Sequence, residues 1–546
     1  LTLLLTWSIF EEPKHTIMKK ITLLFVLVII ILYSSYSASA QRPNENEYDK
    51  LSMLYHKSPD LGFSYPSLEE VYAFLDSIAS QYPEITYLDT SWTSQFLGLR
   101  IPVLKISDNP EMEEDEPAIG YDGLIHSKEP VSMLTCIEII RYLVSNYYIN
   151  EDVKMWVDNS EIFIIPMLNP DGWKYINDSS LFYIPSWRKN MRDNDNSGYF
   201  DPLFDGVDLN RNFDLFWDYG NPNPNNYYYR GPFPFSEKET QLKRKIASEQ
   251  KYTLSINYHS PSSTYAWKES VIISWKYANV INPDFELSKT IADSIAARIP
   301  KFNLPEQYDI EYGPCDMGYS DCWMRAMNGT LEFVIETGPE FFPPDSAPLQ
   351  IAEANVEGGL YLLNRVFGPG ITGHVVNANT LQPISAEIRV VDIDTAQLYV
   401  EPRKNDSIFG RFFRLLNPGV YTIEAIADGY DTIKLENIVV NDTLVYLTFN
   451  LVSLEEYANN SQIQVKVYPN PIFDKTTIEF SLTKPCDVIL GVYNLYGQMI
   501  EILLNQRKQN GNHKIHWNTE KLPAGMYYYR IQTGEQAVTG NMVVIK

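Results

Sequence analysis

Apolar runs of strand length alternate with helical stretches through the first part of the chain. The strand-like runs lie at 101–106, 118–124, 161–168, 252–258 and 330–335. The helix-like stretches lie at 67–81, 131–148, 236–249 and 285–298. Strands that alternate with crossover helices favour a twisted, mostly parallel mixed sheet with helices on both faces, so we predict an α/β domain here. Open α/β sheets bind ligands beyond the carboxyl ends of their strands, so polar residues at those ends are candidate site residues.

Two of the seven histidines lie in settings that are typical of a metal site. His126 and Glu129 are three residues apart at the edge of a predicted helix, so one turn can direct both side chains at a single ion. His259 follows one apolar run, and Glu336 follows another. Catalytic zinc takes three nitrogen or oxygen ligands and leaves one position for water, on which a glutamate can act as general base. Taken alone, a His-x-x-Glu spacing is more often a pair on a helix surface.

Charged and polar residues lie in a definite order between these two histidines. Arg188 supplies a fixed cation, and Asp208, Asn210 and Arg211 stand close together further along the chain. With this order of residues, the stretch from about 55 to 367 resembles the zinc carboxypeptidase family, the carboxypeptidase A-like metallopeptidases. The resemblance implies one bound Zn²⁺ ion and, as substrates, the C-termini of peptides or proteins.

The resemblance also implies roles for the residues of the predicted metal site. His126, Glu129 and His259 would bind the zinc ion, and Glu336 would be the general base and acid. Asp208 is similar to the acid that orients the first zinc histidine in this family. A metal-bound histidine needs such a partner on its other ring nitrogen.

The substrate contacts are implied in the same way. Arg188 would stabilise the oxyanion, and Asn210 and Arg211 would hold the terminal carboxylate of the substrate. Arginine suits this task because its rigid fork pairs bidentately with a carboxylate. Tyr312 would close over the substrate. The stretch from Tyr312 to Glu336 is slightly longer than in the digestive enzymes of the family, so an ordinary half-buried tyrosine is the alternative.

Four cysteines are too few for a disulfide scaffold. Cys315 and Cys322 follow Tyr312 in a stretch that resembles the mobile loop of the family, where they could form a bridge or remain free thiols. Residues near Ser320 should form the floor of the pocket for the C-terminal side chain of the substrate. The preference of that pocket is left open.

The segment 193–198 offers a second metal site. Asp193, Asp195 and Ser197 alternate oxygen-bearing side chains before a glycine, as calcium loops do, which predicts Ca²⁺. Phe204 occupies the position at which such loops carry a bidentate acid. A polar surface loop is therefore the alternative.

After residue 368 the pattern changes to short strands and turns, which predicts two small all-β sandwich domains. Residues 369–453 resemble the transthyretin-like, carboxypeptidase-regulatory β-sandwich, and a polar linker follows at 454–464. Residues 465–546 resemble the C-terminal sorting domain of the type IX secretion pathway of Gram-negative, Bacteroidota-type bacteria. This resemblance implies recognition by the type IX secretion machinery, export across the outer membrane and removal of the sorting domain.

The N-terminal region, 1–40, has the features of a secretory signal peptide. Met18 is the expected start, and it is followed by two lysines, an apolar run at 21–32 and small residues at 38–40. The apolar run is short for a membrane span, so we expect cleavage rather than a stable membrane anchor. The catalytic domain would then occupy 41–368.

The charge balance excludes two classes of partner. With 69 acidic against 44 basic residues, the net charge is −25, so nucleic acid and anionic membranes are poor partners.

Taken together, these features of the sequence predict a secreted or cell-surface zinc metallocarboxypeptidase that is exported through the periplasm of a Gram-negative bacterium. Two alternatives remain open. One is a related zinc amidohydrolase on peptidoglycan stem peptides or acyl amino acids, and the other is a non-catalytic surface binding protein on the same fold.

Overall fold

The computed structural model describes residues 65–177, 186–262, 268–344, 346–394, 399–454, 463–482, 484–495, 497–533 and 536–546. These residues form two compact units. The first contains the described residues up to Val376 together with Gln382–Ile426 and Ile433–Phe449, and the second contains Asn377–Leu381, Ala427–Thr432 and the described part of Asn450–Lys546. The predicted signal peptide at 1–40 and most of the predicted linker at 454–464 lie outside the described residues.

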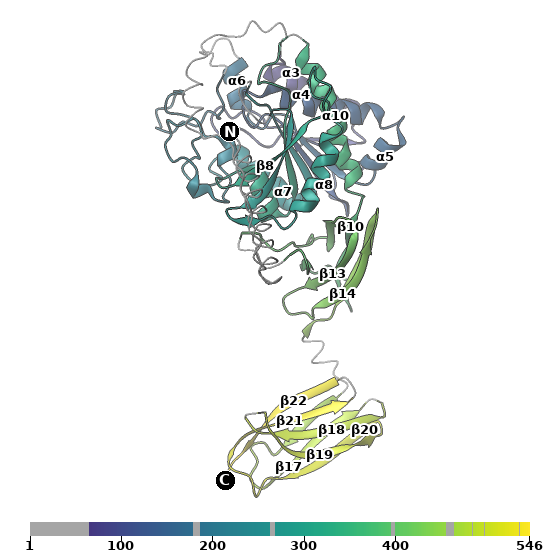
Figure 1. The fold of residues 1–546 in the computed structure, drawn as a ribbon. Coiled ribbons are helices and arrows are strands. Elements are labelled where there is room, and N and C mark those ends of the chain that lie inside the picture. Colours follow the sequence, from purple (N-terminus) through teal and green to yellow (C-terminus); the bar gives the residue numbers. More distant parts are fainter. Residues whose placement is uncertain are drawn as a thin grey trace, which may run out of the picture. The chain divides into compact units, whose positions relative to one another are not determined.

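A nine-stranded sheet forms the centre of the first unit (Figure 1). Its strands are β1 Thr86–Asp89, β2 Val103–Ile106, β3 Ala118–Asp122, β4 Glu161–Ile165, β5 Leu254–His259, β6 Ser270–Tyr277, β7 Val280–Ile281, β8 Asp309–Cys315 and β9 Leu331–Glu336. They lie in the order β1-β2-β4-β3-β5-β9-β6-β7, and β8 pairs with β6. The sheet is parallel from β4 through β9 and antiparallel where β2 meets β4 and β6 meets β9. The predicted α/β fold is confirmed.

Helices cover both faces of this sheet. The helical segments of the described residues are α3 Leu68–Gln81, α4 Pro130–Asn146, α5 Glu151–Val157, α6 Pro170–Asn177, η1 Leu209–Arg211, η2 Trp217–Tyr219, α7 Lys238–Gln250, α8 Phe285–Ala296, α9 Ser320–Trp323, η3 Met324–Asn328 and α10 Ala347–Arg365. Helices α4, α8 and α10 share one hydrophobic core with the sheet, and α7 shares the other. Along β4, Ile162 and Ile164 belong to the first core and Phe163 and Ile165 to the second, as strand alternation requires.

Local sequence signals begin two of these helices. Ser67 and Glu70 form a capping box at α3: the Glu70 N–H donates to the Ser67 hydroxyl at 3.2 Å, and the Ser67 N–H donates to the Glu70 carboxylate at 2.7 Å. Pro130 occupies the first turn of α4, where its missing N–H costs no helical bond. Because α4 begins directly after Glu129, the start of this helix positions a predicted zinc ligand.

Two strands end on predicted site residues. His259 is the last residue of β5 and Glu336 is the last residue of β9, so each strand extends one residue beyond the apolar run in the sequence. These strands are parallel neighbours, and His259 and Glu336 are paired in register. The carboxyl ends of both strands therefore meet at one edge of the sheet, where ligands bind in folds of this class.

The region after α10 contains only strands among its regular elements in the described residues. It begins with β10 Gly370–Asn377, β11 Glu387–Val390, β12 Arg411–Leu415, β13 Gly419–Ile426, β14 Ile433–Val440 and β15 Leu444–Leu451. These form two three-stranded sheets, in the orders β12-β10-β15 and β11-β13-β14. The predicted change from an α/β domain to an all-β region is confirmed.

Two further sheets form the C-terminal region. One contains β16 Ile463–Tyr468, β17 Lys475–Leu482 and β20 Gly511–Asn518, and the other contains β18 Cys486–Tyr493, β19 Met499–Lys508, β21 Gly525–Thr533 and β22 Gln536–Val544. Phe480 and Trp517 from the first sheet share a core with Leu490 and Ile531 from the second, so the two sheets pack face to face.

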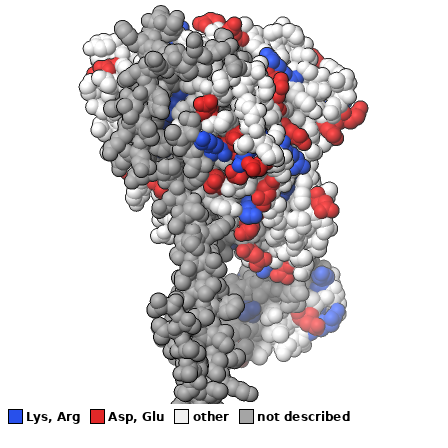
Figure 2. All heavy atoms as spheres, turned by 45° about the horizontal axis from the view of Figure 1, so that its top comes forward, with Lys and Arg blue, Asp and Glu red and all other residues white. Residues whose placement is uncertain are grey.

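The surface of the described residues is charged and mixed. On the face drawn in Figure 2, acidic and basic side chains lie interspersed among the other residues. Within the described part of the chain, no helix is both long and apolar enough to cross a membrane.

Candidate metal centre

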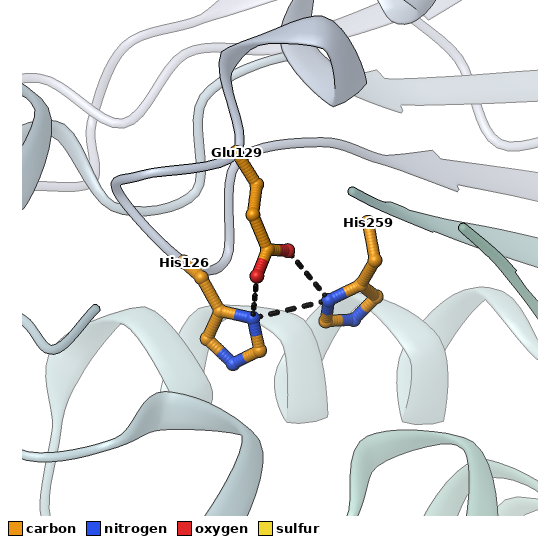
Figure 3. A group of neighbouring side chains, drawn as sticks. All are labelled: His126, Glu129 and His259. Carbon is orange, nitrogen blue, oxygen red and sulfur yellow. Dashed lines mark hydrogen bonds and ion pairs between the residues drawn. The ribbon is translucent and has the colours of Figure 1, made fainter. Parts of the chain in front are cut away.

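Three side chains from two distant parts of the sequence meet at the edge of the sheet (Figure 3). His126 and Glu129 lie in the turn between β3 and α4, and His259 ends β5. Nδ1 of His126 lies 3.0 Å from one carboxylate oxygen of Glu129 and 3.1 Å from Nδ1 of His259. Nδ1 of His259 lies 2.9 Å from the other carboxylate oxygen. The structure thus brings together the three residues that the sequence predicts as zinc ligands.

The chemistry of these three groups suits a divalent metal. All three residues are buried, with His126 only 1 % exposed. Burial lowers the pKa of the His259 ring to about 4, so this imidazole is neutral and offers a lone pair. Burial opposes the ionisation of Glu129, but the two neighbouring histidines hold the pKa of its carboxyl well below the usual range. Two imidazole nitrogens and one carboxylate, all within 4.8 Å of one another, form a donor set that fits zinc.

Asp208 connects the metal ligands to the predicted substrate-binding residues. This aspartate is fully buried and precedes η1. Its Oδ1 lies 3.2 Å from Nε2 of His126, and its Oδ2 accepts a hydrogen bond of 2.8 Å from Nε of Arg188. Burial opposes its ionisation, yet Arg188 and Arg211 hold the pKa of Asp208 well below its usual range. An ionised partner at Nε2 favours a proton there and leaves Nδ1 of His126 available to a metal.

The residues that are predicted to bind the substrate carboxylate lie in η1. Asn210 and Arg211 are both buried. Oδ1 of Asn210 accepts a hydrogen bond of 2.9 Å from the backbone N–H of Ser320, so the amide NH₂ group is the donor that Asn210 presents elsewhere. The guanidinium of Arg211 lies 4.5 Å from the centre of the Tyr319 ring. Both side chains are therefore held in place by the segment that contains α9.

The remaining two predicted residues lie on strands. Glu336 is partly exposed and neighbours His259 in the register, so it belongs to the same edge of the sheet as the metal ligands. Tyr312 lies in β8, where its ring packs against Phe285 of α8 with a centroid distance of 5.4 Å. The structure thus places Glu336 at the site and Tyr312 in a half-buried strand position. The closure of Tyr312 over a substrate stays a prediction.

A disulfide supports this side of the site. Cys315 and Cys322 are bonded, so the bridge that the sequence allowed is present and the free-thiol alternative is not. Within the segment that the bridge encloses, the carbonyl of Gly318 accepts a hydrogen bond of 3.2 Å from the N–H of Phe213, and its N–H donates to the carbonyl of Leu215 at 2.9 Å. The bridged segment is thus fastened to the stretch that follows η1.

The predicted calcium loop is held by its own hydrogen bonds. The backbone N–H of Ser197 donates to the carboxylates of Asp193 at 3.1 Å and Asp195 at 3.0 Å, and the N–H of Gly198 donates to Asp193 at 2.8 Å. Asp205 lies near the same two acids. Carboxylates that accept bonds from nearby backbone in this way are typical of Asx turns. The calcium prediction finds no support in this geometry, and the alternative of a polar loop accounts for it.

Two groups at the site were not predicted from the sequence. The ammonium of Lys128 contacts the hydroxyl of Tyr227, beside the metal ligands. Lys243 of α7 lies 2.6 Å from a carboxylate oxygen of Asp122 and 2.9 Å from one of Glu332, in a fully buried ion cluster. The members of each group come from different elements, so spacing along the chain gives no sign of them. The one signal of these contacts in the sequence is Glu332, an acid inside the apolar run that forms β9.

Two family models match this chain. The model described as zinc carboxypeptidase matches residues 71–358, just over half of the chain, and this stretch contains every residue of the metal centre. The model described as secretion system C-terminal sorting domain matches residues 466–546.

Individual relatives carry related names. "Zinc carboxypeptidase" from Saccharothrix mutabilis subsp. capreolus is 33 % identical over 153 residues, which cover 28 % of this chain and 33 % of that protein. Human "Carboxypeptidase D" is 26 % identical over 451 residues, which cover 79 % of this chain and 30 % of that protein. "Carboxypeptidase B" from Astacus astacus is 26 % identical over 318 residues, which cover 56 % of this chain and 97 % of that protein. The chain thus spans about a third of the length of the first two relatives.

Two solved structures align with part of this chain. The crystal structure of carboxypeptidase A from Helicoverpa armigera aligns with a TM-score of 0.48 and 21 % identity, over 59 % of this chain and 80 % of that one. Thrombin-activatable fibrinolysis inhibitor aligns with a TM-score of 0.48 and 20 % identity, over 55 % of this chain and 74 % of that one.

Proposed function

The chain belongs to the zinc carboxypeptidase family, and we propose that it hydrolyses the C-terminal peptide bond of peptides and proteins. The observation that carries the proposal is the convergence of two imidazole nitrogens and a carboxylate, from His126, His259 and Glu129, with separations of 2.9 to 3.1 Å. A zinc ion held by these groups would polarise the substrate carbonyl and lower the pKa of a water molecule.

Glu336 would carry the protons in this reaction. Its carboxylate would accept a proton from the attacking water and then donate that proton to the leaving amine. The register pairing of Glu336 with His259 supports this role, because it puts the acid beside the metal ligands at the open edge of the sheet. Arg188 would donate to the oxygen on which negative charge develops, and its bond to Asp208 fixes its position for that purpose.

Recognition of the chain end would be the task of Asn210 and Arg211. A carboxylate at the substrate terminus needs donors that converge on two oxygens, and an amide next to a guanidinium supplies them. Asp208 precedes both residues and also bonds to His126. This connection supports a fixed spacing between the carboxylate-binding residues and the metal ligands, so only the last peptide bond would reach the metal.

The proton role is tested by Glu336→Gln. This change removes the basic carboxylate but keeps the shape of the side chain. Turnover of a peptide with a free C-terminus should therefore fall by roughly 10²- to 10⁴-fold. Zinc content, measured on the purified variant, should stay equal to that of the wild-type protein. Glu353→Gln, on the exposed face of α10, is the matched control and should keep full activity. Full activity in Glu336→Gln would refute the assignment.

The substrate class separates this proposal from its alternatives. The zinc-loaded protein would be incubated with linear peptides and with peptidoglycan stem peptides, and the products would be read by mass. A carboxypeptidase should shorten the linear peptides from the C-terminus. Exclusive cleavage of stem peptides would indicate an amidohydrolase, and zinc-dependent binding without any product would indicate a binding protein.

We also propose that the C-terminal region directs secretion. The match of residues 466–546 to a sorting-domain model supports export through type IX secretion machinery to the cell surface or the medium, with removal of this domain. The proposed domain limits are 41–368 for the catalytic domain, 369–453 for a transthyretin-like domain and 465–546 for the sorting domain. In a bacterium that has this machinery, a chain truncated after residue 453 should stay in the periplasm, and the exported full-length protein should lack the mass of the last domain.

A further inference from the structure

A row of side chains lies directly beneath the metal ligands on the same face of the sheet. In β5, Ile256 and Tyr258 enter the main hydrophobic core, so Asn257 and His259 point to the opposite face. Asn257 pairs in register with Val334 of β9, as His259 pairs with Glu336. Two residues of strand span about 7 Å. Asn257 therefore lies one side-chain row below the metal ligands.

The amide of Asn257 is buried without a hydrogen-bond partner. Asn257 is 0 % exposed, and neither its Oδ1 nor its Nδ2 has a hydrogen-bond partner among the described residues. An amide that is left unpaired in the interior costs about 1–3 kcal/mol, so such groups are rare unless a ligand or water uses them. On the β9 side of Asn257 this row is apolar, since Val334 packs against Ile272 of β6. Asn257 is thus the polar group that borders this apolar part of the row.

Acidic groups surround this row. Asp122 of β3 is the register neighbour of Asn257 on its other side. One row further from the metal, Glu332 pairs with Ser255, and Lys243 contacts both Asp122 and Glu332. Two buried carboxyl groups thus share one ammonium beneath this row.

A third buried carboxylate belongs to the same region. Oδ2 of Asp321 accepts a hydrogen bond of 2.6 Å from the hydroxyl of Ser274 in β6, and its Oδ1 has no hydrogen-bond partner among the described residues. Ser320 connects this region to the chain-end contacts, because its N–H donates to Asn210 and its hydroxyl donates to Glu332 at 2.7 Å. Ser320 thus links the proposed carboxylate contact at Asn210 to the buried Glu332.

We propose that Asn257 determines the specificity of the C-terminal side-chain pocket, and that the pocket prefers a cationic residue, lysine or arginine. The inference rests on the proposed function, because the substrate carboxylate must lie at Asn210 and Arg211 for the last side chain to point toward this floor. The amide oxygen of Asn257 accepts a hydrogen bond from an ammonium or a guanidinium. The nearby carboxyl groups of Asp122 and Glu332, which share a single ammonium, favour the same cation. An aliphatic side chain would leave the amide unpaired, and an acidic one would meet like charge.

The test compares dipeptide substrates that share a blocked N-terminal residue and end in Lys, Arg, Gln, Leu, Phe, Glu or Ala. The zinc-loaded wild-type protein should have a kcat/KM for the Lys and Arg substrates at least about tenfold above that for Leu and Phe. Asn257→Leu should abolish this difference, whereas Asn257→Asp should increase it. The alanine side chain is too short to reach Asn257, so kcat/KM for each substrate is compared with that for the Ala substrate in the same protein. Zinc content and melting temperature check the fold, and Asn257→Ser replaces Asn257→Leu if the latter does not fold.

Two results would overturn the inference but leave the proposed function intact. One is a wild-type preference for Leu, Phe, Gln or Glu over Lys and Arg. The other is a preference for Lys and Arg that survives unchanged in active Asn257→Leu or Asn257→Ser protein. A wild-type protein that cleaves none of these substrates, alanine-terminated included, would instead overturn the proposed function, and the inference would fall with it.

Discussion

Asp208 is the residue on which both parts of the site depend. One of its carboxylate oxygens bonds to His126 and also accepts the N–H of Asn210 at 3.1 Å, and the other accepts the side chain of Arg188. A buried carboxylate with several charged and polar partners is held in a single geometry. The metal ligand, the oxyanion contact and the start of η1 are therefore fixed relative to one another by one side chain.

At the same scale, Arg211 should determine whether the protein acts on chain ends. Arg211→Ala removes the guanidinium that would pair with the terminal carboxylate, and the loss of a buried charged contact costs about 2–5 kcal/mol. The kcat/KM for a free peptide should therefore fall by at least about 30-fold. Arg211→Lys should lie between the wild type and Arg211→Ala, because an ammonium cannot form the bidentate pair.

Steady-state kinetics on the three proteins provide the measurement. The control is Arg244→Ala, which changes an arginine of α7 that lies over the Phe235 ring. Wild-type kinetics in Arg211→Ala would show that the terminal carboxylate is bound elsewhere.

At the scale of elements, the bridged segment after β8 supports the proposed chain-end contacts. The disulfide joins the end of β8 to α9, and Gly318 between the two cysteines forms backbone hydrogen bonds with Phe213 and Leu215. Ser320, at the start of α9, donates to Asn210. The position of Asn210 thus depends on a segment that is about 110 residues away in sequence, and the disulfide limits the freedom of that segment.

Removal of the bridge should weaken substrate binding more than it weakens metal binding. In the double variant Cys315→Ser/Cys322→Ser, the segment that holds Asn210 gains freedom, so KM for a free peptide should rise several-fold, while zinc content stays unchanged. Stability should fall by about 2–4 kcal/mol. Cys486→Ser removes a free cysteine from the second unit and is the matched control. An unchanged KM in the double variant would mean that the disulfide has no part in positioning Asn210.

The sequence predicts the parallel centre of the sheet but not all of its strands. Strands β3, β4, β5 and β9 are short, buried apolar runs between helical stretches. Such a run predicts a buried strand from the sequence alone. Strand β8 contains Gly313 and Pro314, which argue against a strand, and the sequence from Gly313 onward resembles the mobile loop of the family. Strand β8 pairs with β6 on one side and lies at an edge of the sheet. An edge strand tolerates a proline, because one side of its backbone forms no bonds to another strand.

The site also has some features that the sequence predicts and others that it does not. The metal ligands could be predicted because His259 ends a strand and because His126 and Glu129 lie just before a helix, where residue type and spacing are informative. The contacts of Asn210 with Ser320 and of Lys243 with Glu332 could not, because they join elements that are brought together only by the sheet order. The calcium prediction relied on residue alternation, which an Asx turn produces equally well.

At the scale of the first unit, a buried aspartate joins the α/β domain to the strands that follow it. Asp284 lies at the start of α8 and contacts Arg325 of η3. Arg403 and Arg414, from the following β region, lie 2.7 Å and 2.9 Å from its carboxylate oxygens. One carboxylate thus has three guanidinium partners, and two of them come from another part of the chain.

Loss of this carboxylate should destabilise the first unit. Asp284→Ala leaves several buried guanidiniums without their shared partner, so the free energy of unfolding should fall by about 3–5 kcal/mol. Asp293→Ala, in the same helix, breaks only an exposed pair with Lys289 and should cost less than about 1 kcal/mol. Denaturant unfolding of the two variants provides the comparison. Equal stabilities would show that the arginine cluster contributes nothing to the junction.

The most direct test of the central claim is mass spectrometry of one peptide in two forms, with a free C-terminus and with an amidated C-terminus. Both would be incubated with the zinc-loaded protein and with protein stripped of metal by a chelator. We expect the zinc-loaded protein to remove residues one at a time from the free C-terminus, to leave the amidated peptide intact, and to lose this activity when the metal is removed. Cleavage at internal bonds, or equal attack on both forms, would contradict the account.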